Sequence, residues 1–199
     1  MKAAVRCPWC PLDDPLYVKY HDEEWGIPQH DGKKLFEMLN LEGAQAGLSW
    51  KTILHKRENY RREFEGFDAE KLSRWKENRI TKALQNPGIV RNQLKVRGVV
   101  RNAQAFLTHF DGDPKKFSAF LWNFVGGKPI QNRPRSMSDV PSSTEISDAM
   151  SRALKKMGFT FVGSTICYAF MQAVGMVCDH VTNCAFAKEK GKRSPKKSA

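Results

Sequence analysis

Helical spacing of apolar residues is the feature that most constrains this chain. After residue 33, apolar side chains recur three and four positions apart, as on one face of an α-helix. The pattern predicts helices from about Leu35 and over residues 48–64, 68–75, 80–86, 91–110 and 115–124. No stretch of useful length alternates apolar and polar residues as a half-buried strand does. The sequence therefore predicts an all-α fold.

A helix, a tight glycine turn and a second helix are expected between residues 142 and 184. Ser142 and Glu145 have the spacing of a capping box at the start of the first helix, and Gly158 is a natural end for it. Ser164 or Thr165 can cap the second helix, and its apolar stripe continues as far as residue 184.

The glycine turn is one way to hold DNA. Gly158 and Gly163 would let backbone N–H groups approach a phosphate, and the helix start at Ser164 and Thr165 favours an anion. A packed helix pair without a ligand has the same sequence pattern, so both interpretations stay open.

The charge balance also indicates a polyanionic partner. Lys and Arg number 33 against 21 Asp and Glu, a formal net charge of +12. Such an excess favours nucleic acid first and a membrane surface second. Residues 188–199 hold six basic residues and one acidic residue, so most of the excess lies elsewhere. We expect residues 1–187 to form a single domain and 188–199 a basic disordered tail.

The N-terminal segment and the lack of a long apolar run indicate the cellular compartment, which in turn bears on the state of the cysteines. MKAAVRCPWC lacks the apolar stretch of a signal peptide, and no run is long enough to cross a membrane. We therefore expect a cytoplasmic protein with no membrane partner, and no feature demands more than a monomer. Its five cysteines should be reduced there, which favours metal binding over disulfides.

Two histidine and cysteine groups stand far apart in the chain. His180 and Cys184 are four residues apart, so on a helix they point the same way. Zinc needs four ligands, and the N-terminal segment offers Cys7, Cys10 and His21. Either the CPWC pair or Cys7 with His21 would complete a structural site. A buried histidine and cysteine without a metal would show the same spacing.

One carboxylate is embedded among apolar residues in LEGAQAGLSW, where Glu42 precedes Trp50. It could end a helix, or it could recognise a flat cationic ring that stacks on an aromatic side chain. The H-x-E triplet at His21–Glu23 resembles a zinc deaminase only superficially, because CPWC precedes it and strands are missing.

Longer motifs carry a family resemblance. RCPW, DDPLYVKYHDEEWG, KLFEMLNLEGAQAGLSW, ALKKMGFTFVGSTICYAFMQAVG and DHVTNC resemble the 3-methyladenine DNA glycosylase I family of bacteria over residues 6–187. The resemblance implies the helix-hairpin-helix glycosylase fold and one structural zinc. It also implies a repair enzyme that flips N3-methyladenine out of duplex DNA, hydrolyses its N-glycosidic bond and leaves an abasic site.

The resemblance also implies roles for individual residues. Zinc would be bound by Cys7, His21, His180 and Cys184. Glu42 would be the catalytic residue and hydrogen-bond the flipped base, and Trp50 would stack on it. The rest of the aromatic pocket would be Tyr20, Trp9, Tyr17 and Trp25. The loop that probes the duplex would contain Gln45, Gly47 and Leu48.

The chain departs from the family pattern in two places. It has an extra residue between Cys7 and His21, together with the additional Cys10, and it has Ala44 where a polar residue is expected. The resemblance further implies that the aspartate of related glycosylases is missing, Asp179 being the nearest candidate. An alternative from another class is a zinc-containing helical DNA-binding module without catalytic activity.

Overall fold

The computed structural model describes residues 4–187, and the segment expected to be a basic tail lies outside them. Its α-helices are α1 (Pro15–Glu23), α2 (Gly32–Gln45), α3 (Trp50–Glu63), α4 (Ala69–Ser73), α5 (Glu77–Ala83), α6 (Gln93–Phe110), α7 (Pro114–Asn123), α8 (Glu145–Lys156) and α9 (Ser164–Ala173). Two 3₁₀ turns are η1 (Glu65–Phe67) and η2 (Met137–Asp139). Two short strands, β1 (Ile130–Gln131) and β2 (Val177–Cys178), pair in parallel. The predicted mostly helical fold is confirmed.

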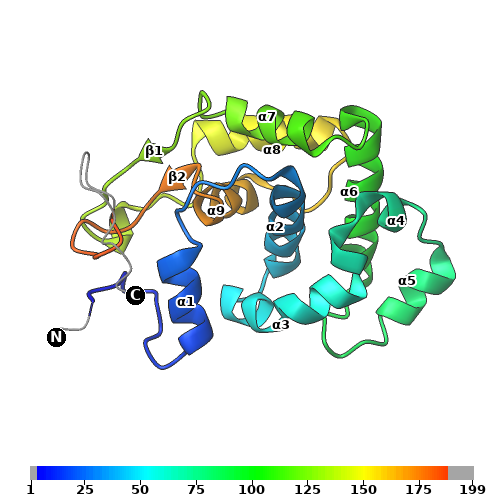
Figure 1. Ribbon diagram of the computed structural model, residues 1–199, viewed down its shortest axis with the longest axis horizontal. Helices are drawn as coiled ribbons and strands as arrows, with labels where there is room; N and C mark the ends of the chain where they lie inside the picture. Colours follow the sequence, from blue (N-terminus) through cyan, green and yellow to red (C-terminus); the bar gives the residue numbers. More distant parts are fainter. Residues whose placement is uncertain (1–3, 188–199) are drawn as a thin grey trace, which may run out of the picture.

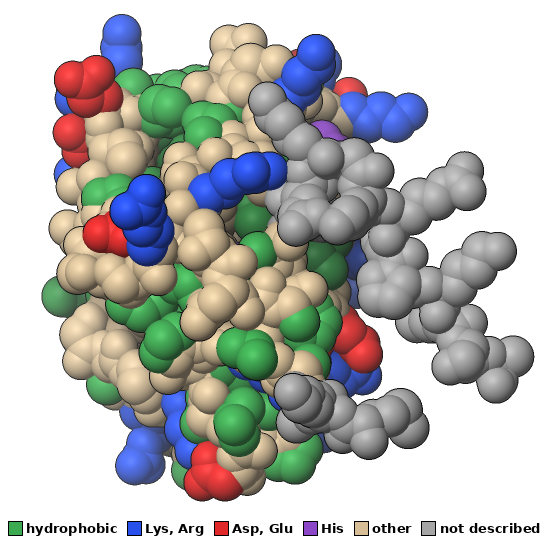
Figure 2. All heavy atoms as spheres, turned by 90° about the vertical axis from the view of Figure 1, so that its left-hand side faces the viewer, with side chains coloured by type: hydrophobic (Ala, Val, Ile, Leu, Met, Phe, Trp, Pro, Cys, Tyr) green, Lys and Arg blue, Asp and Glu red, His purple; other side chains and the backbone are tan. Residues whose placement is uncertain are grey.

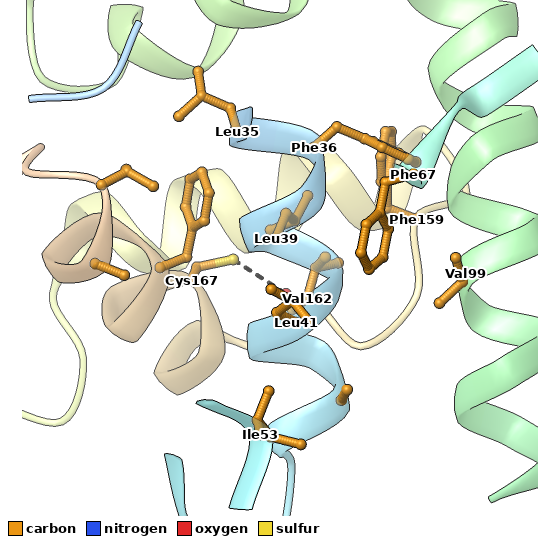
Figure 3. Packing of buried hydrophobic residues seen from close by; sticks show 14 of the residues in the cluster. Leu35, Phe36, Leu39, Leu41, Ile53, Phe67, Val99, Phe159, Val162 and Cys167 are labelled. Carbon is orange, nitrogen blue, oxygen red and sulfur yellow. Dashed lines mark hydrogen bonds between the residues drawn. The ribbon is translucent and has the colours of Figure 1, made fainter. Parts of the chain in front are cut away.

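Helix α2 is the centre of the molecule. Figure 1 shows α9 and α6 on opposite sides of it, and α2 also packs against α3 and α7. Its side chains Leu35, Leu39 and Leu41 are completely buried. Figure 3 shows these leucines along α2, with Cys167 of α9 to one side of the helix and Ile53 of α3 beyond its lower end. The helix that carries Glu42 is therefore held from several sides.

The predicted capping box of α8, Ser142 with Glu145, is wrong. Thr144 is the N-cap: its hydroxyl accepts the N–H of Ser147, and the Ser147 hydroxyl accepts the N–H of Thr144. This reciprocal pair does what Ser142 and Glu145 were expected to do. The predicted N-cap of α9, Ser164 or Thr165, is also wrong: the helix begins at Ser164 and its N-cap is Gly163.

The second helix does not reach residue 184. It ends at Ala173, and Gly175 has a φ of +69°. A Cβ on Gly175 would lie 2.3 Å from the carbonyl carbon of Ile27, so only glycine fits beside this segment. The chain then enters β2, and its later residues lie in turns. His180 and Cys184 are therefore presented by irregular backbone.

Helix α1 was not predicted, although its start signals are present. The Asp14 side chain accepts the N–H of Tyr17, and Pro15 occupies the first turn. Both features are typical of a helix N-terminus. This helix places Tyr17, Tyr20 and His21 on one face.

The turn between α8 and α9 is seated on two other helices. Gly158 has a φ of +87°, as its predicted helix-ending position requires. Phe161 lies close to α2 and α6: a Cβ on Gly43 would be 3.0 Å from its Cβ, and one on Gly98 2.9 Å from its ring. Asn102 of α6 accepts the N–H of Thr160 at 2.7 Å. The turn is therefore fixed to α2 and α6.

The surface near the two ends of the described chain carries mixed charge. Figure 2 shows Lys and Arg side chains scattered over this face among Asp and Glu, without a continuous basic patch. The excess positive charge does not gather on this face. No helix within residues 4–187 combines the length and apolar character needed to cross a membrane.

Candidate active site and metal centre

Four side chains from the two ends of the described chain meet in one buried cluster. The ligand atoms of Cys7, His21, His180 and Cys184 all lie within 4.8 Å of one another. Cys7 Sγ is 3.4 Å from His180 Nδ1, and Cys184 Sγ is 3.4 Å from His180 Nδ1 and 3.6 Å from His21 Nε2. Two sulfur and two nitrogen atoms therefore converge on a point where they could hold a metal ion.

The outer nitrogen of each histidine is engaged by an oxygen. His21 Nδ1 donates to Asp22 Oδ1 at 2.7 Å, and His180 Nε2 donates to the Trp25 carbonyl at 3.2 Å. Asp22 is in turn paired with Arg6 at 2.7 Å. These acceptors leave a lone pair on the inward nitrogen of each ring, as metal-binding histidines require.

The spacing left open whether Cys10 or His21 joins Cys7 in the cluster, and the structure places His21 there. Cys10 is buried but is not part of the four-residue cluster. A tight turn, in which the Cys10 N–H donates to the Cys7 carbonyl at 3.0 Å, separates the two side chains. Cys178 is also buried outside the cluster.

A cavity of about 280 Å³ opens beside this cluster. It lies at the small end of the roughly 300–1,000 Å³ range of ligand pockets, which suits one nucleobase. Its walls come from α1, α2, α3, α9 and the segment around η2. The lining residues are Trp9, Tyr17, Tyr20, Trp25, Glu42, Gln45, Trp50, Met137, Val140, Pro141, Ser142, Thr165, Tyr168, Ala169 and Gln172.

The aromatic wall of the cavity rests directly on the metal cluster. The Trp9 ring lies 4.8 Å from the Trp25 ring and 5.0 Å from the His21 ring. Trp25 is in turn 4.7 Å from His180, nearly perpendicular to it. The indole side chains that line the cavity are thus packed on two of the candidate ligands.

Glu42 is a buried carboxyl group in the cavity wall. It lies in the last turn of α2, and only 4% of it is exposed. Within residues 4–187 no group donates a hydrogen bond to it, and burial raises its pKa to about 8. Trp50, the first residue of α3, lines the same cavity, with its ring 5.2 Å from Tyr20. A carboxyl group without a partner between aromatic faces can receive a flat ring that carries positive charge.

A family model for methyladenine glycosylases matches residues 9–188. The chain belongs to this family. It is 51% identical over 180 residues to DNA-3-methyladenine glycosylase 1 of Escherichia coli (strain K12), covering 90% of this chain and 95% of that protein.

Solved structures of methyladenine glycosylases have the same fold. A crystal structure of 3-methyladenine DNA glycosylase I matches with a TM-score of 0.88 at 49% identity, covering 91% of this chain and 98% of that one. A variant of a 3-methyladenine DNA glycosylase I in complex with 3-methyladenine matches with a TM-score of 0.87 at 34% identity, covering 92% and 98%. The predicted family is confirmed.

Helix α9 contributes two residues that the sequence analysis missed. Tyr168 and Gln172 line the cavity together with Thr165, which was predicted as a DNA contact. Their spacing is that of one helix face, but the sequence does not say which face meets α1. Asp179 lies behind this wall with 1% of it exposed, and it accepts hydrogen bonds from Tyr168, Gln172 and Asn132, each at 2.7 Å. Its carboxylate is occupied by these donors and is not part of the lining.

Two turns of this methyladenine glycosylase adjoin the cavity. The first follows α2: Gln45 lines the cavity, Gly47 has a φ of +74°, and Leu48 is 42% exposed. The second precedes α9, where Thr165 lines the cavity. Among the described residues, no acceptor receives the backbone N–H groups of residues 161–166. The Ser164 hydroxyl, by contrast, is bonded to Asp148 and Ser147 of α8.

Proposed function

We propose that this chain is a monofunctional DNA-3-methyladenine glycosylase that excises N3-methyladenine from alkylated DNA. The observation that carries the proposal is Glu42, an unpartnered carboxyl group buried in a base-sized aromatic cavity. The named activity of the E. coli relative and the complex with 3-methyladenine support it. A module that only binds DNA would have no use for such a cavity, so we do not favour that alternative.

The chemistry requires little from the protein. Methylation at N3 makes the base cationic, so the bond from N9 to C1′ breaks with its electron pair moving onto the base, which leaves neutral. Water adds to C1′ and loses a proton to solvent, which leaves an abasic sugar. Glu42 and Trp50 hold and orient the cation after it is flipped from the duplex. No lysine lines the cavity in the described part of the chain, so no Schiff base with the sugar is expected.

We propose that the four-residue cluster binds one structural Zn²⁺. A tetrahedral zinc with ligands at about 2.0–2.3 Å places those ligands roughly 3.3–3.8 Å apart. Three of the six distances between ligand atoms, at 3.4–3.6 Å, fall in that range, and all six are within 4.8 Å. With two cysteines and two histidines filling all positions, such an ion would have no open site for chemistry. Its contribution would be to fix the aromatic wall.

The two turns beside the cavity would contact DNA. The free N–H groups before and within the first turn of α9 would bind a phosphate in the manner of a helix-hairpin-helix motif, with Gly158, Gly163, Ser164 and Thr165 shaping the turn. Gln45, Gly47 and Leu48 would probe the duplex where the base has left. One chain supplies every part of the site, which supports a monomer with one glycosylase domain over residues 1–187. We expect it to act on bacterial DNA in the cytoplasm.

Release of free 3-methyladenine tests the proposal. The protein is incubated with methylated duplex DNA, and the liberated bases are separated and quantified, with undamaged DNA as the control. We expect 3-methyladenine to be released and the strand to remain unbroken until the abasic site is cleaved by alkali. A folded protein that binds the cavity ligand but releases no base would support the non-catalytic alternative instead.

Replacing Trp50 by alanine should weaken binding of free 3-methyladenine by roughly 5- to 150-fold, because stacking of a base on an aromatic ring is worth about 1–3 kcal/mol. Titration calorimetry measures the affinity. Trp75→Ala is the matched control, since Trp75 is as buried as Trp50 (9% and 8% exposed) but lies outside the cavity. The control should lose stability and keep its affinity; equal loss of affinity in both variants would contradict stacking at Trp50.

Binding to undamaged duplex should fall steeply as salt rises, because the positive excess binds phosphates and releases counterions. Deleting residues 188–199 should weaken this binding and reduce its salt dependence while excision persists. Fluorescence anisotropy at several salt concentrations measures both. A salt-independent affinity would mean that the excess charge does not serve DNA binding.

A further inference from the structure

Lys95, the third residue of α6, binds the C-terminal end of α2. Its Nζ lies 2.8 Å from the carbonyl oxygen of Ala44 and 2.6 Å from that of Ala46. The last carbonyls of a helix lack partners within the helix, and a cation there is favourable. Burial lowers the pKa of Lys95. Among the described residues no carboxylate forms an ion pair with it.

The two carbonyls lie where α2 leads into the turn that carries Leu48: Ala44 is in the last turn of the helix. Ala46 is the C-cap of α2, and Ser49 is the N-cap of α3, so residues 46–49 connect the two helices. A Cβ on Gly47 would meet nothing within 4 Å, and Leu48 is largely exposed. The tip of this turn therefore has little packing of its own, and its position depends on how its ends are held.

Helix α6 also holds the other turn beside the cavity. Asn102 accepts the N–H of Thr160 at 2.7 Å and donates to the Thr160 carbonyl at 3.2 Å. Gly98 leaves room for the Phe161 ring. The middle of α6 thus fixes the turn before α9, and Lys95, near the N-terminal end of the same helix, fixes the turn after α2.

We propose that Lys95 is a positioning residue for duplex opening: it sets the 46–49 turn relative to the α8–α9 turn so that Leu48 meets the duplex where the base leaves. This inference rests on the proposed glycosylase function. The ammonium group acts through the backbone it holds, since two of its three N–H groups already bind carbonyls.

The test compares Lys95→Met with wild type on two forms of one methylated oligonucleotide. Single-turnover excision is measured on the duplex and on the single strand, where no base pair has to be opened. We expect the duplex rate to fall about 10- to 100-fold, the cost of misplacing a reacting part by about 1 Å. The single-strand rate and the affinity for free 3-methyladenine should stay within about twofold, because the cavity wall is untouched.

Two further variants separate positioning from charge. Arg101→Met removes one positive charge from an exposed position on the same helix and should leave both rates unchanged. Lys95→Arg keeps donors that can reach both carbonyls and should restore most of the duplex rate. The salt dependence of duplex binding should be the same for Lys95→Met and wild type; a slope reduced by about one would show a phosphate contact instead.

The outcomes are distinct. Equal loss on duplex and single strand, or an unchanged duplex rate in a folded Lys95→Met protein, would overturn the positioning role. A wild-type protein that releases no 3-methyladenine from either substrate would instead contradict the proposed function itself.

Discussion

We expect His180→Ala to lose the proposed zinc and much of the stability of the protein. The imidazole lies at the centre of the cluster, 3.4 Å from both cysteine sulfurs, and its removal leaves a three-ligand site. Loss of a metal belongs to the few changes that cost about 4–5 kcal/mol or more, which corresponds to roughly 8–20 °C in melting temperature for a chain of this size. Elemental analysis and calorimetry measure the two effects, with one zinc per chain expected in the wild type.

The two cysteines of CPWC provide the matched pair. Cys7→Ser should lose zinc, because Cys7 is in the cluster, whereas Cys10→Ser should keep it. Both side chains are buried, so both substitutions place a hydroxyl in a similar environment. If Cys7→Ser retained zinc and Cys10→Ser lost it, Cys10 would be the ligand in place of Cys7. A wild-type protein without zinc after careful purification would contradict the assignment of the metal.

The rate of excision at protein concentrations too low to saturate the DNA should rise about tenfold per pH unit up to pH 8 and then level off. Burial raises the pKa of Glu42 to about 8 in the free protein, so the carboxylate that attracts a cationic base becomes the main form only above that pH. Glu42→Gln should show no such rise. Near pH 8.5 its rate should be roughly 10- to 150-fold lower, since a hydrogen bond to a charged group is worth about 1.5–3 kcal/mol.

The excision rate at saturating protein distinguishes two roles of Glu42, holding the flipped base and activating the attacking water. If Glu42 mainly holds the base, the loss in Glu42→Gln should be largest at limiting protein and in base affinity. A loss of about 10²–10⁴-fold at saturation would indicate a general base instead. Asp179→Asn is the carboxylate control, and it should retain excision as long as zinc is retained. An inactive, zinc-containing Asp179→Asn beside a fully active Glu42→Gln would reverse the assignment.

Stability gives an independent measure of the same ionisation. The folded protein holds the Glu42 proton to about pH 8, whereas the ordinary value is 4.5. The unfolded chain therefore releases this proton first, and the stability that the neutral carboxyl provides below pH 4.5 is lost progressively up to pH 8. Glu42→Gln removes this dependence. Its stability should exceed that of the wild type at pH 8 by more than at pH 5, as measured by urea unfolding.

Helical periodicity predicted most of the fold but not where the last helix ends. The apolar stripe of α9 runs on into Val177 and Cys178, which are buried as a strand against β1. A short buried strand and a buried helix segment have the same apolar pattern. Gly175 carried the relevant signal, but its need for a positive φ arises from contact with Ile27, far away in the sequence.

The sequence predicted those residues of the candidate site that lie in the motifs of the family resemblance. The aromatic residues, Glu42 and Gln45 that the family resemblance singled out all line one cavity. Spacing alone could not choose between Cys10 and His21 as the partner of Cys7, because a turn after Cys7 keeps the Cys10 sulfur out of the cluster. Tyr168 and Gln172 were missed because only the packing of α9 shows which of its faces meets the cavity.

The separation of the ligands along the chain has a consequence during synthesis. Cys7 and His180 are 173 residues apart. At about 5–20 residues per second, the first ligand is synthesised roughly 9–35 seconds before its partner. Over that interval Cys7 is a free thiol that glutathione, oxidants or another metal can reach. The nascent protein acquires its completed lesion pocket only after every helix has been translated, so zinc availability at that moment would set the active fraction.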